Sequence, residues 1–114
     1  MNMNQYQHLA ARTINKNLTA NQLLINAALG LAGESGEAAD HIKKVFFQGH
    51  PLDPKHITKE LGDIMWYVAE MCTALTQLLN ETYTMDDVAE NNIEKLKKRY
   101  PEGFSTELSL NRKE

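Results

Sequence analysis

The chain has 114 residues, of which 42% are hydrophobic and 24% charged, and its formal net charge at pH 7 is −3. This length fits one domain with a core of moderate size, the composition excludes a largely disordered chain, and the charge gives no general attraction to nucleic acid or anionic membranes. No apolar stretch is long enough to span a bilayer and no signal peptide is recognisable, so we expect a cytoplasmic protein without a membrane partner. The single cysteine, Cys72, excludes an intramolecular disulfide and is expected in the core.

The first half of the chain predicts two helices and a loop. A short helix is expected from about residue 4 to residue 17, and Thr19 or Asn21 then caps a long helix that ends near Phe47. Eight apolar residues form a stripe on one face of this second helix: Leu24, Ala27, Ala28, Leu31, Ala38, Ile42, Val45 and Phe46. The stretch QGHPLDP then contains a glycine and two prolines and is expected to be a loop.

The second half predicts two more helices. The third starts just after Pro54 and carries a second apolar stripe: Ile57, Leu61, Ile64, Met65, Val68, Cys72, Leu75 and Leu79. Thr84 followed by Asp87 is an acidic variant of the capping box, and it predicts a fourth helix through Arg99. No strand-like alternation is sustained, so the expected fold is all-α, an antiparallel helical hairpin with additional helices at the N- and C-terminal ends.

The chain is expected to form one domain over residues 1–104. Pro101 and Gly103 end the fourth helix, and residues 105–114 are expected to follow as a loose tail. There is no internal repeat or low-complexity linker that would indicate a second domain.

Two pairs of acids accompany the stripes of the second and third helices. In GLAGESGEAAD, Glu34 borders the stripe and Glu37 lies one step further round the same flank, and KELGD repeats this arrangement with Glu60 and Asp63. Two antiparallel helices packed stripe to stripe bring flanks of the same hand together. At about 1.5 Å per residue, the midpoints of the two pairs lie within roughly 6 Å of the same level along the hairpin. The four carboxylates are therefore expected on one side of the hairpin.

Four clustered carboxylates favour a bound cation. One pair about 4 Å apart repels by about 4 kcal/mol at an effective dielectric of 20, and a cation would offset this cost. Oxygen ligands suit Mg²⁺ or Mn²⁺. A di-iron bundle instead calls for Glu-x-x-His, a spacing of three residues, whereas His41 follows Glu37 by four, so the di-iron interpretation is weak. Glu-x-x-Glu on a helix is commonplace and normally solvated, so it is the matched hand and level of the two pairs that favour a shared site.

Other residues near the acids leave alternatives open. Gly33 and Gly36 thin the helix beside the first pair and Gly62 beside the second, which suits either an approaching ligand or close helix packing. Trp66 lies opposite its helix's stripe, which favours an interface over a base-stacking wall. His41 lies between Glu34 and Glu37 on the wheel and either contacts a substrate or hydrogen-bonds an acid.

The fourth helix has a polar interruption. Its apolar stripe contains Asn92, and Lys95 and Arg99 lie on the border of that stripe, which ends at Tyr100. A buried amide needs hydrogen-bond partners. These side chains either belong to a binding surface or simply extend from a core seam to water.

Together these motifs resemble a known family. GLAGESGEAAD, a proline-containing loop, KELGDIMWYV and the closing NIEKLKKRYPEGF are similar to the MazG-like all-α nucleoside triphosphate pyrophosphohydrolases, whose signature is Glu-x-x-Glu, a spacer, then Glu-x-x-Asp. The similarity covers about residues 21 to 104. It implies a homodimer or tetramer of four-helix-bundle type, with an active site that draws on more than one chain. The chain holds one such domain, not two, and lacks the paired-glutamate run of the enzymes that hydrolyse phosphoribosyl-ATP.

The resemblance also implies an activity and a set of site residues. The activity is Mg²⁺-dependent cleavage of a nucleoside triphosphate between the α and β phosphorus atoms, giving a monophosphate and pyrophosphate, in the service of nucleotide-pool house-cleaning. The expected metal ligands and catalytic residues are Glu34, Glu37, Glu60 and Asp63, and the expected substrate contacts are His41, Asn92, Lys95, Arg99 and Tyr100. The alternative from another class is a non-catalytic helical oligomerisation module with a structural divalent-cation site.

Overall fold

The computed structural model describes residues 1–112, and every regular element in them is helical. The elements are α1 (Met3–Ala10), the 3-10 turn η1 (Ala11–Thr13), α2 (Ala20–Phe47), α3 (Pro54–Leu79), α4 (Met85–Arg99) and α5 (Thr106–Leu110). The predicted all-α fold is confirmed for this part of the chain. Within the same range, none of the helices has the combination of length and hydropathy that crossing a membrane requires.

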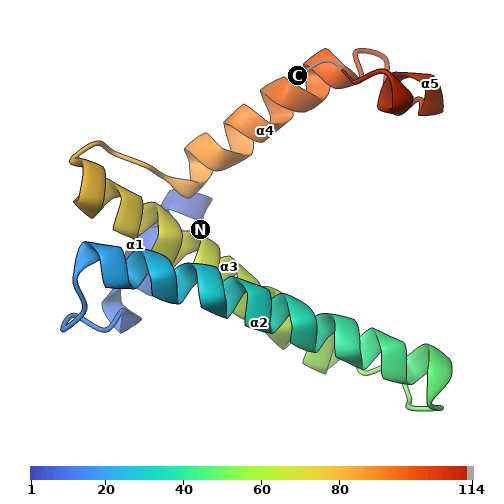
Figure 1. The fold of residues 1–114 in the computed structure, drawn as a ribbon, viewed down its shortest axis with the longest axis horizontal. Helices are drawn as coiled ribbons and strands as arrows, with labels where there is room; N and C mark the ends of the chain where they lie inside the picture. The colour runs from blue at the N-terminus through green and yellow to red at the C-terminus, as the bar shows by residue number, and fades with distance from the viewer. Residues whose placement is uncertain (113–114) are drawn as a thin grey trace.

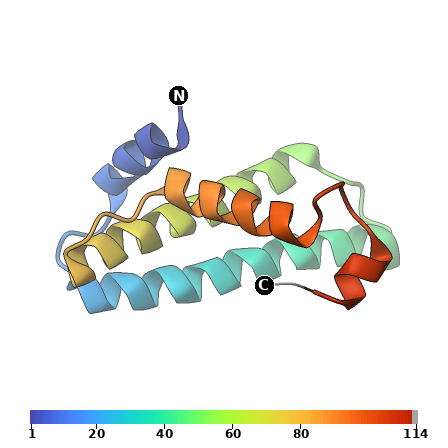
Figure 2. The same ribbon diagram turned by 90° about the horizontal axis from the view of Figure 1, so that it is seen from above.

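α2 and α3 form the predicted antiparallel hairpin, and they run side by side in both views (Figure 1, Figure 2). Thr19 caps α2: its hydroxyl accepts a hydrogen bond from the backbone N–H of Gln22 at 3.2 Å, and the Gln22 side chain accepts from the N–H of Thr19 at 2.9 Å. At the start of α3, the Asp53 carboxylate accepts from two backbone N–H groups of the first turn. Pro54 occupies the first helical position, where its missing N–H is not needed.

The first helix is shorter than the sequence predicts. α1 ends at Ala10, η1 adds one turn, and the backbone of Ile14 is already extended, with φ −70° and ψ 140°. Asn15 then accepts a hydrogen bond from the backbone N–H of Asn17 at 3.0 Å. Such local side-chain bonds offer the backbone an alternative to the helix. The predicted continuation to about residue 17 is therefore wrong.

The C-terminal segment is more ordered than the predicted loose tail. Ser105 caps α5, because its hydroxyl accepts a hydrogen bond from the backbone N–H of Leu108 at 3.2 Å. Residues 113 and 114 of the predicted tail lie outside the described residues.

A small core joins α1, α3 and the start of α4. Its buried members are Ala10, Ala69, Cys72 and Met85. The burial of Cys72 confirms its expected place in the core. Trp66 packs against this core, and its indole N–H donates to Thr13 Oγ1 at 2.8 Å. The residue for which the sequence favours an interface between chains therefore makes its contacts within one chain.

α4 is anchored at its start and then leaves the hairpin. The backbone N–H groups of Met85 and Asp86 donate to the side-chain oxygens of Gln7 and Asn4, at 2.8 and 3.0 Å, so α1 fixes the first turn of α4. From there α4 diverges from α2 and α3, and α5 lies at its far end (Figure 1).

The two hairpin helices meet along a seam that differs from the predicted one. The sequence predicts that the two apolar stripes face each other, with the acids on one flank. Instead Glu60 is 7% exposed, and members of both stripes are exposed: Ala28, Ile42, Phe46, Leu61, Met65 and Leu79. Glu60 therefore lies between the helices with Glu34 half-buried beside it, whereas Glu37 and Asp63 are exposed at the flank. These six stripe residues point outward, and the other ten are buried or half-buried. A stripe shows which face a helix buries but not whether the partner belongs to the same chain.

Gly30 shows how closely the helices approach along this seam. A Cβ built on Gly30 would collide with the aromatic ring of Tyr67 on α3, so only glycine leaves room for that ring. By contrast, a Cβ at Gly33, Gly36 or Gly62 would meet nothing within 4 Å. Packing within the chain therefore explains Gly30 and does not explain the other three.

These two environments predict opposite effects of alanine. We expect Gly30→Ala to lower the free energy of unfolding by about 1–3 kcal/mol, because the ring of Tyr67 must move. We expect Gly33→Ala to raise it by up to about 1 kcal/mol, because alanine favours a helix where space is open. Urea unfolding at one fixed protein concentration measures both, and equal effects of the two variants would contradict the seam described above.

Candidate metal centre

Three of the four predicted acids converge in the seam. Glu34 and Glu37 come from successive turns of α2 and Glu60 from α3, and each offers an oxygen atom within 4.8 Å of the others. Asp63 lies one turn further along α3 and is exposed. It stays near enough for its charge to act on Glu34. The structure thus brings together Glu34, Glu37 and Glu60 and leaves Asp63 at the edge of the cluster.

The electrostatics of the cluster are those of crowded carboxylates. A hydrogen bond with the Glu60 side chain raises the pKa of Glu34 above its usual value, and burial and the charges of Glu60 and Asp63 raise it further. Among residues 1–112, Glu34 Oε2 and Glu60 Oε2 are buried oxygens without a hydrogen-bond partner. A buried acceptor without a partner costs about 1–3 kcal/mol, and more when it is charged.

These residues fit a hard divalent cation. All the donors are carboxylate oxygens, which are the ligands that Mg²⁺ and Mn²⁺ prefer. Two of the oxygens have no other partner, so a cation between them would satisfy them and offset the mutual repulsion. The exposed carboxylates of Glu37 and Asp63 leave one side of the cluster open to solvent.

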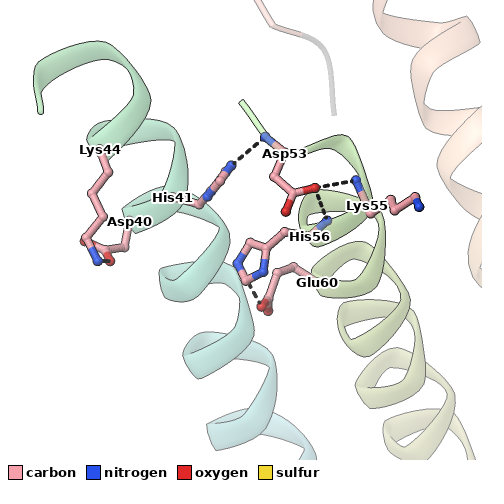
Figure 3. A network of polar contacts seen from close by, with 7 residues as sticks. All are labelled: Asp40, His41, Lys44, Asp53, Lys55, His56 and Glu60. Carbon is pink, nitrogen blue, oxygen red and sulfur yellow. Dashed lines mark hydrogen bonds and ion pairs between the residues drawn. The ribbon is translucent and has the colours of Figure 1, made fainter. Parts of the chain in front are cut away.

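Two histidines close the loop end of the seam (Figure 3). His56 extends from α3 toward α2, and its Nε2 lies 3.5 Å from Glu60 Oε1. Within residues 1–112, His41 does not form the hydrogen bond to Glu34 or Glu37 that was one of the two alternatives for it. Its Nε2 accepts a hydrogen bond from the backbone N–H of Asp53 at 3.3 Å, and its ring centre lies 4.8 Å from that of His56. The two imidazoles therefore tie the hairpin loop to the acid cluster.

An open groove of about 580 Å³ adjoins the acids on the side of α2. Its lining includes Gly33, Gly36, Glu37, His41 and Lys44. The two glycines leave this space free of side chains beside the cluster, which supports the ligand-approach alternative for them. Lys44 Nζ lies 2.9 Å from Asp40 Oδ2, and this contact is the largest cause of the lowered pKa of Asp40.

The four predicted substrate contacts of α4 are not brought to the acids within one chain. Asn92 and Lys95 are exposed, and Arg99 and Tyr100 are half-buried toward the end of α4. Tyr100 packs on Phe104, with ring centres 5.4 Å apart. Because α4 diverges from the hairpin, these residues lie on a separate arm of the molecule (Figure 1).

One polar pair in the same seam was not predicted from the sequence. Glu70 on α3 is 2% exposed, and both of its carboxylate oxygens accept hydrogen bonds from Asn26 Nδ2, at 2.9 and 3.1 Å. Burial raises the pKa of Glu70, and the bond from Asn26 partly opposes that shift. A signal was present in the sequence, because Glu70 follows Asp63 by seven residues and so lies on the same face of α3.

Comparison with known proteins identifies the family of this chain. The family model described as the MazG nucleotide pyrophosphohydrolase domain matches residues 22–104, which include all four acids. The chain belongs to this MazG family. Its similarity to the MazG-like proteins, expected from the acid motifs, is confirmed.

The chain is also similar to a phage protein. This MazG chain is 33% identical over 79 residues to the Gene 37 protein of Mycobacterium phage L5. The match covers 66% of this chain and 64% of the phage protein, so it spans less than two thirds of that relative. No solved structure is significantly similar.

The carboxylate cluster of this MazG domain predicts a specific response to magnesium. We expect Mg²⁺ at 100 times its Kd to raise the free energy of unfolding by about 2.7 kcal/mol. We expect Glu60→Gln to remove this response and to unfold at a higher temperature than the unsubstituted protein when both are free of metal, because repulsion is relieved. Thermal unfolding with and without Mg²⁺ measures both effects.

Glu81→Gln is the matched control, because Glu81 is an exposed carboxylate outside the seam that accepts a hydrogen bond from Tyr83. It should keep the full Mg²⁺ response. If Mg²⁺ stabilised Glu60→Gln as much as the unsubstituted protein, Glu60 would not be a metal ligand.

Proposed function

We propose that this chain is a Mg²⁺-dependent nucleoside triphosphate pyrophosphohydrolase that cleaves the bond between the α and β phosphorus atoms. The observation that carries the proposal is the convergence of Glu34, Glu37 and Glu60, with two buried oxygens that lack partners, in a chain of the MazG family. The products would be a nucleoside monophosphate and pyrophosphate. Removal of surplus or non-standard nucleotides from the pool is the role that fits this reaction.

The residues of the seam have separate roles in this proposal. Glu34, Glu37, Glu60 and Asp63 are the ligands for Mg²⁺, or for Mn²⁺ in its place. The bound cation supplies neutralisation of the triphosphate charge and a lowered pKa for the attacking water. His56 orients the Glu60 carboxylate through the 3.5 Å contact between Nε2 and Oε1. Residues that hydrogen-bond to metal ligands commonly orient them in this way.

A second copy of the chain completes the site in this proposal. The outward apolar surface of the hairpin is extensive: Leu29 is 70% exposed and Phe46 75% exposed. On α4, Val88 and Ile93 are about half exposed, at 49% and 50%. A helix that exposes this much apolar surface gains stability by covering it. Two hairpins packed through these faces would form a four-helix bundle, as a homodimer or within a tetramer.

In such an assembly, α4 of one chain can approach the acids of another. This arrangement gives Asn92, Lys95, Arg99 and Tyr100 their proposed contacts with the nucleotide, although within one chain they lie on a separate arm. His41 keeps its proposed place beside the substrate because it lines the groove next to Glu37.

Direct assay of a nucleotide panel tests the reaction. We expect Mg²⁺-dependent release of equal amounts of monophosphate and pyrophosphate from at least one nucleoside triphosphate, measured by chromatography and a coupled pyrophosphate assay. Diphosphate with orthophosphate would contradict the assigned bond. Absence of turnover across the panel would favour the oligomerisation module with a structural cation.

Substitution of one ligand tests the residue assignment. We expect Glu37→Gln to lower turnover by at least about 100-fold while the protein stays folded and assembled, because the transition-state charge loses one preorganised partner. Glu81→Gln should retain full activity. Full activity in Glu37→Gln would remove Glu37 from the site.

A charge on the outward face tests the assembly. We expect Leu29→Asp to reduce the mass measured by light scattering to that of a smaller species, and to abolish turnover if two chains form the site. Leu52→Asp, at an exposed leucine of the hairpin loop, should leave the mass unchanged. An assembled and active Leu29→Asp protein would exclude this face as the interface.

A further inference from the structure

Glu70, which accepts a hydrogen bond from Asn26, is a buried carboxyl group that the proposed chemistry does not use. Glu70 is 2% exposed, and its partner in the structure is a neutral amide, not a cation. A buried carboxyl group costs stability unless it is well paired, and an apolar residue at such a position would often be more stabilising. Stability therefore gives no reason for this pair.

The pair lies on the same seam as the acid cluster. Asn26, Gly30 and Glu34 follow one another at intervals of four residues on one face of α2. Their partners on α3 keep one antiparallel register, because Asn26 contacts Glu70, Gly30 lies against Tyr67, and Glu34 interacts with Glu60. Seven residues separate Glu70 from Asp63, so the pair lies about 10 Å along the hairpin from the edge of the acid cluster.

An aromatic ring occupies the step between the pair and the acids. The ring of Tyr67 lies over Gly30. It also makes an edge-to-face contact with the ring of Trp66, with ring centres 5.1 Å apart. The loop end of the seam, on the far side of the acids, carries the imidazoles of His41 and His56 and leads to Lys44. The two imidazoles and Lys44 thus lie on one side of the acid cluster, and the Asn26–Glu70 pair lies on the other.

We infer that Asn26 contacts the base of the nucleotide and that Glu70 is the positioning residue that fixes its amide. This inference rests on the proposed function. With the α and β phosphates at the acids and the terminal phosphate toward the histidines, the sugar and base extend over the half-buried ring of Tyr67, along the open edge of the seam, toward Asn26. The distance from the α phosphorus atom to the hydrogen-bonding edge of a base is comparable to that step.

The orientation of the amide gives the pair its specificity. Because Nδ2 donates to the Glu70 carboxylate, the amide oxygen of Asn26 is directed away from α3. Asn26 is exposed, so this oxygen is accessible to a ligand. It presents an acceptor to an N–H group on the base edge. Without Glu70 the amide can turn, and the acceptor loses its fixed place.

The test compares kcat/KM for nucleoside triphosphates that differ only in the base. The unsubstituted protein should prefer one base. We expect Asn26→Ala to reduce kcat/KM for that nucleotide by between about 5- and 100-fold and to bring the values for the other bases closer to it, as removal of a base contact does. Inhibition by pyrophosphate, which has no base, should be unchanged.

Glu70→Gln separates positioning from a structural role. Glutamine keeps the size of the side chain but can also donate to Asn26, so it no longer fixes the amide. We expect the preference among bases to fall in this variant because KM for the preferred nucleotide rises. Asn21→Ala, at an exposed asparagine in the first turn of α2, is the control and should keep the full preference.

The outcomes distinguish this inference from the proposed function. If the unsubstituted protein releases pyrophosphate but Asn26→Ala retains its preference among bases, the inference is overturned and the proposed function stands. Equal kcat/KM for all bases in the unsubstituted protein overturns it as well. If no nucleotide is hydrolysed, the proposed function and the inference fall together. Circular dichroism and thermal unfolding establish that each variant is folded before its kinetics are compared.

Discussion

The mutual repulsion of carboxylates in the seam between α2 and α3 is the constraint on which the rest of the structure depends. Glu34, Glu37 and Glu60 bring carboxylate oxygens within 4.8 Å of one another, and Glu60 takes a buried place between the helices that an apolar residue would otherwise fill. One close pair costs about 4 kcal/mol at an effective dielectric of 20, against a total stability of roughly 5–15 kcal/mol for a domain. A cation bound among these oxygens would offset this cost, and the fold and cation binding would then be interdependent.

Placing the acids inside the seam also determines where the apolar residues go. With one side of each helix committed to the seam, the stripes lie beside it, and Leu29, Phe46 and Leu61 stay exposed in a single chain. The core that one chain does build is small and lies at one end, where Ala10, Cys72 and Met85 meet. The position of the acids along the seam therefore accounts both for the polar site and for the apolar residues left exposed.

The seam has a direction as well as a composition. Its loop end holds His41, His56 and the groove, its middle holds the acids, and its other end holds Tyr67 and the Asn26–Glu70 pair. A triphosphate with a sugar and a base has the same order of charged, reacting and neutral parts. The antiparallel register, fixed by the caps at Thr19 and Asp53, is what aligns these groups from two helices into one line.

The helices and the acids were predictable because their signals are local. Caps, prolines and periodicity act within a few residues, so the bounds of α2, α3 and α4 follow from Thr19, Pro54 and Thr84. Local competition also explains why α1 is shorter than predicted, because the Asn15 side chain accepts a hydrogen bond from the backbone N–H of Asn17 in place of a helical bond. Spacing alone placed Glu34, Glu37 and Glu60 at one level of one hairpin.

Only the tertiary structure decided which faces of the helices meet. Periodicity measures how apolar a face is, but it does not say whether that face is covered by the same chain. Glu60 was therefore assigned to a flank although it is buried between the helices. The contacts of Asn26 with Glu70 and of Gly30 with Tyr67 join residues far apart in the sequence. The amino-acid order thus determined the helices and the chemistry of the acids, whereas the rotation of one helix against the other, a property of the packed pair, decided their surroundings.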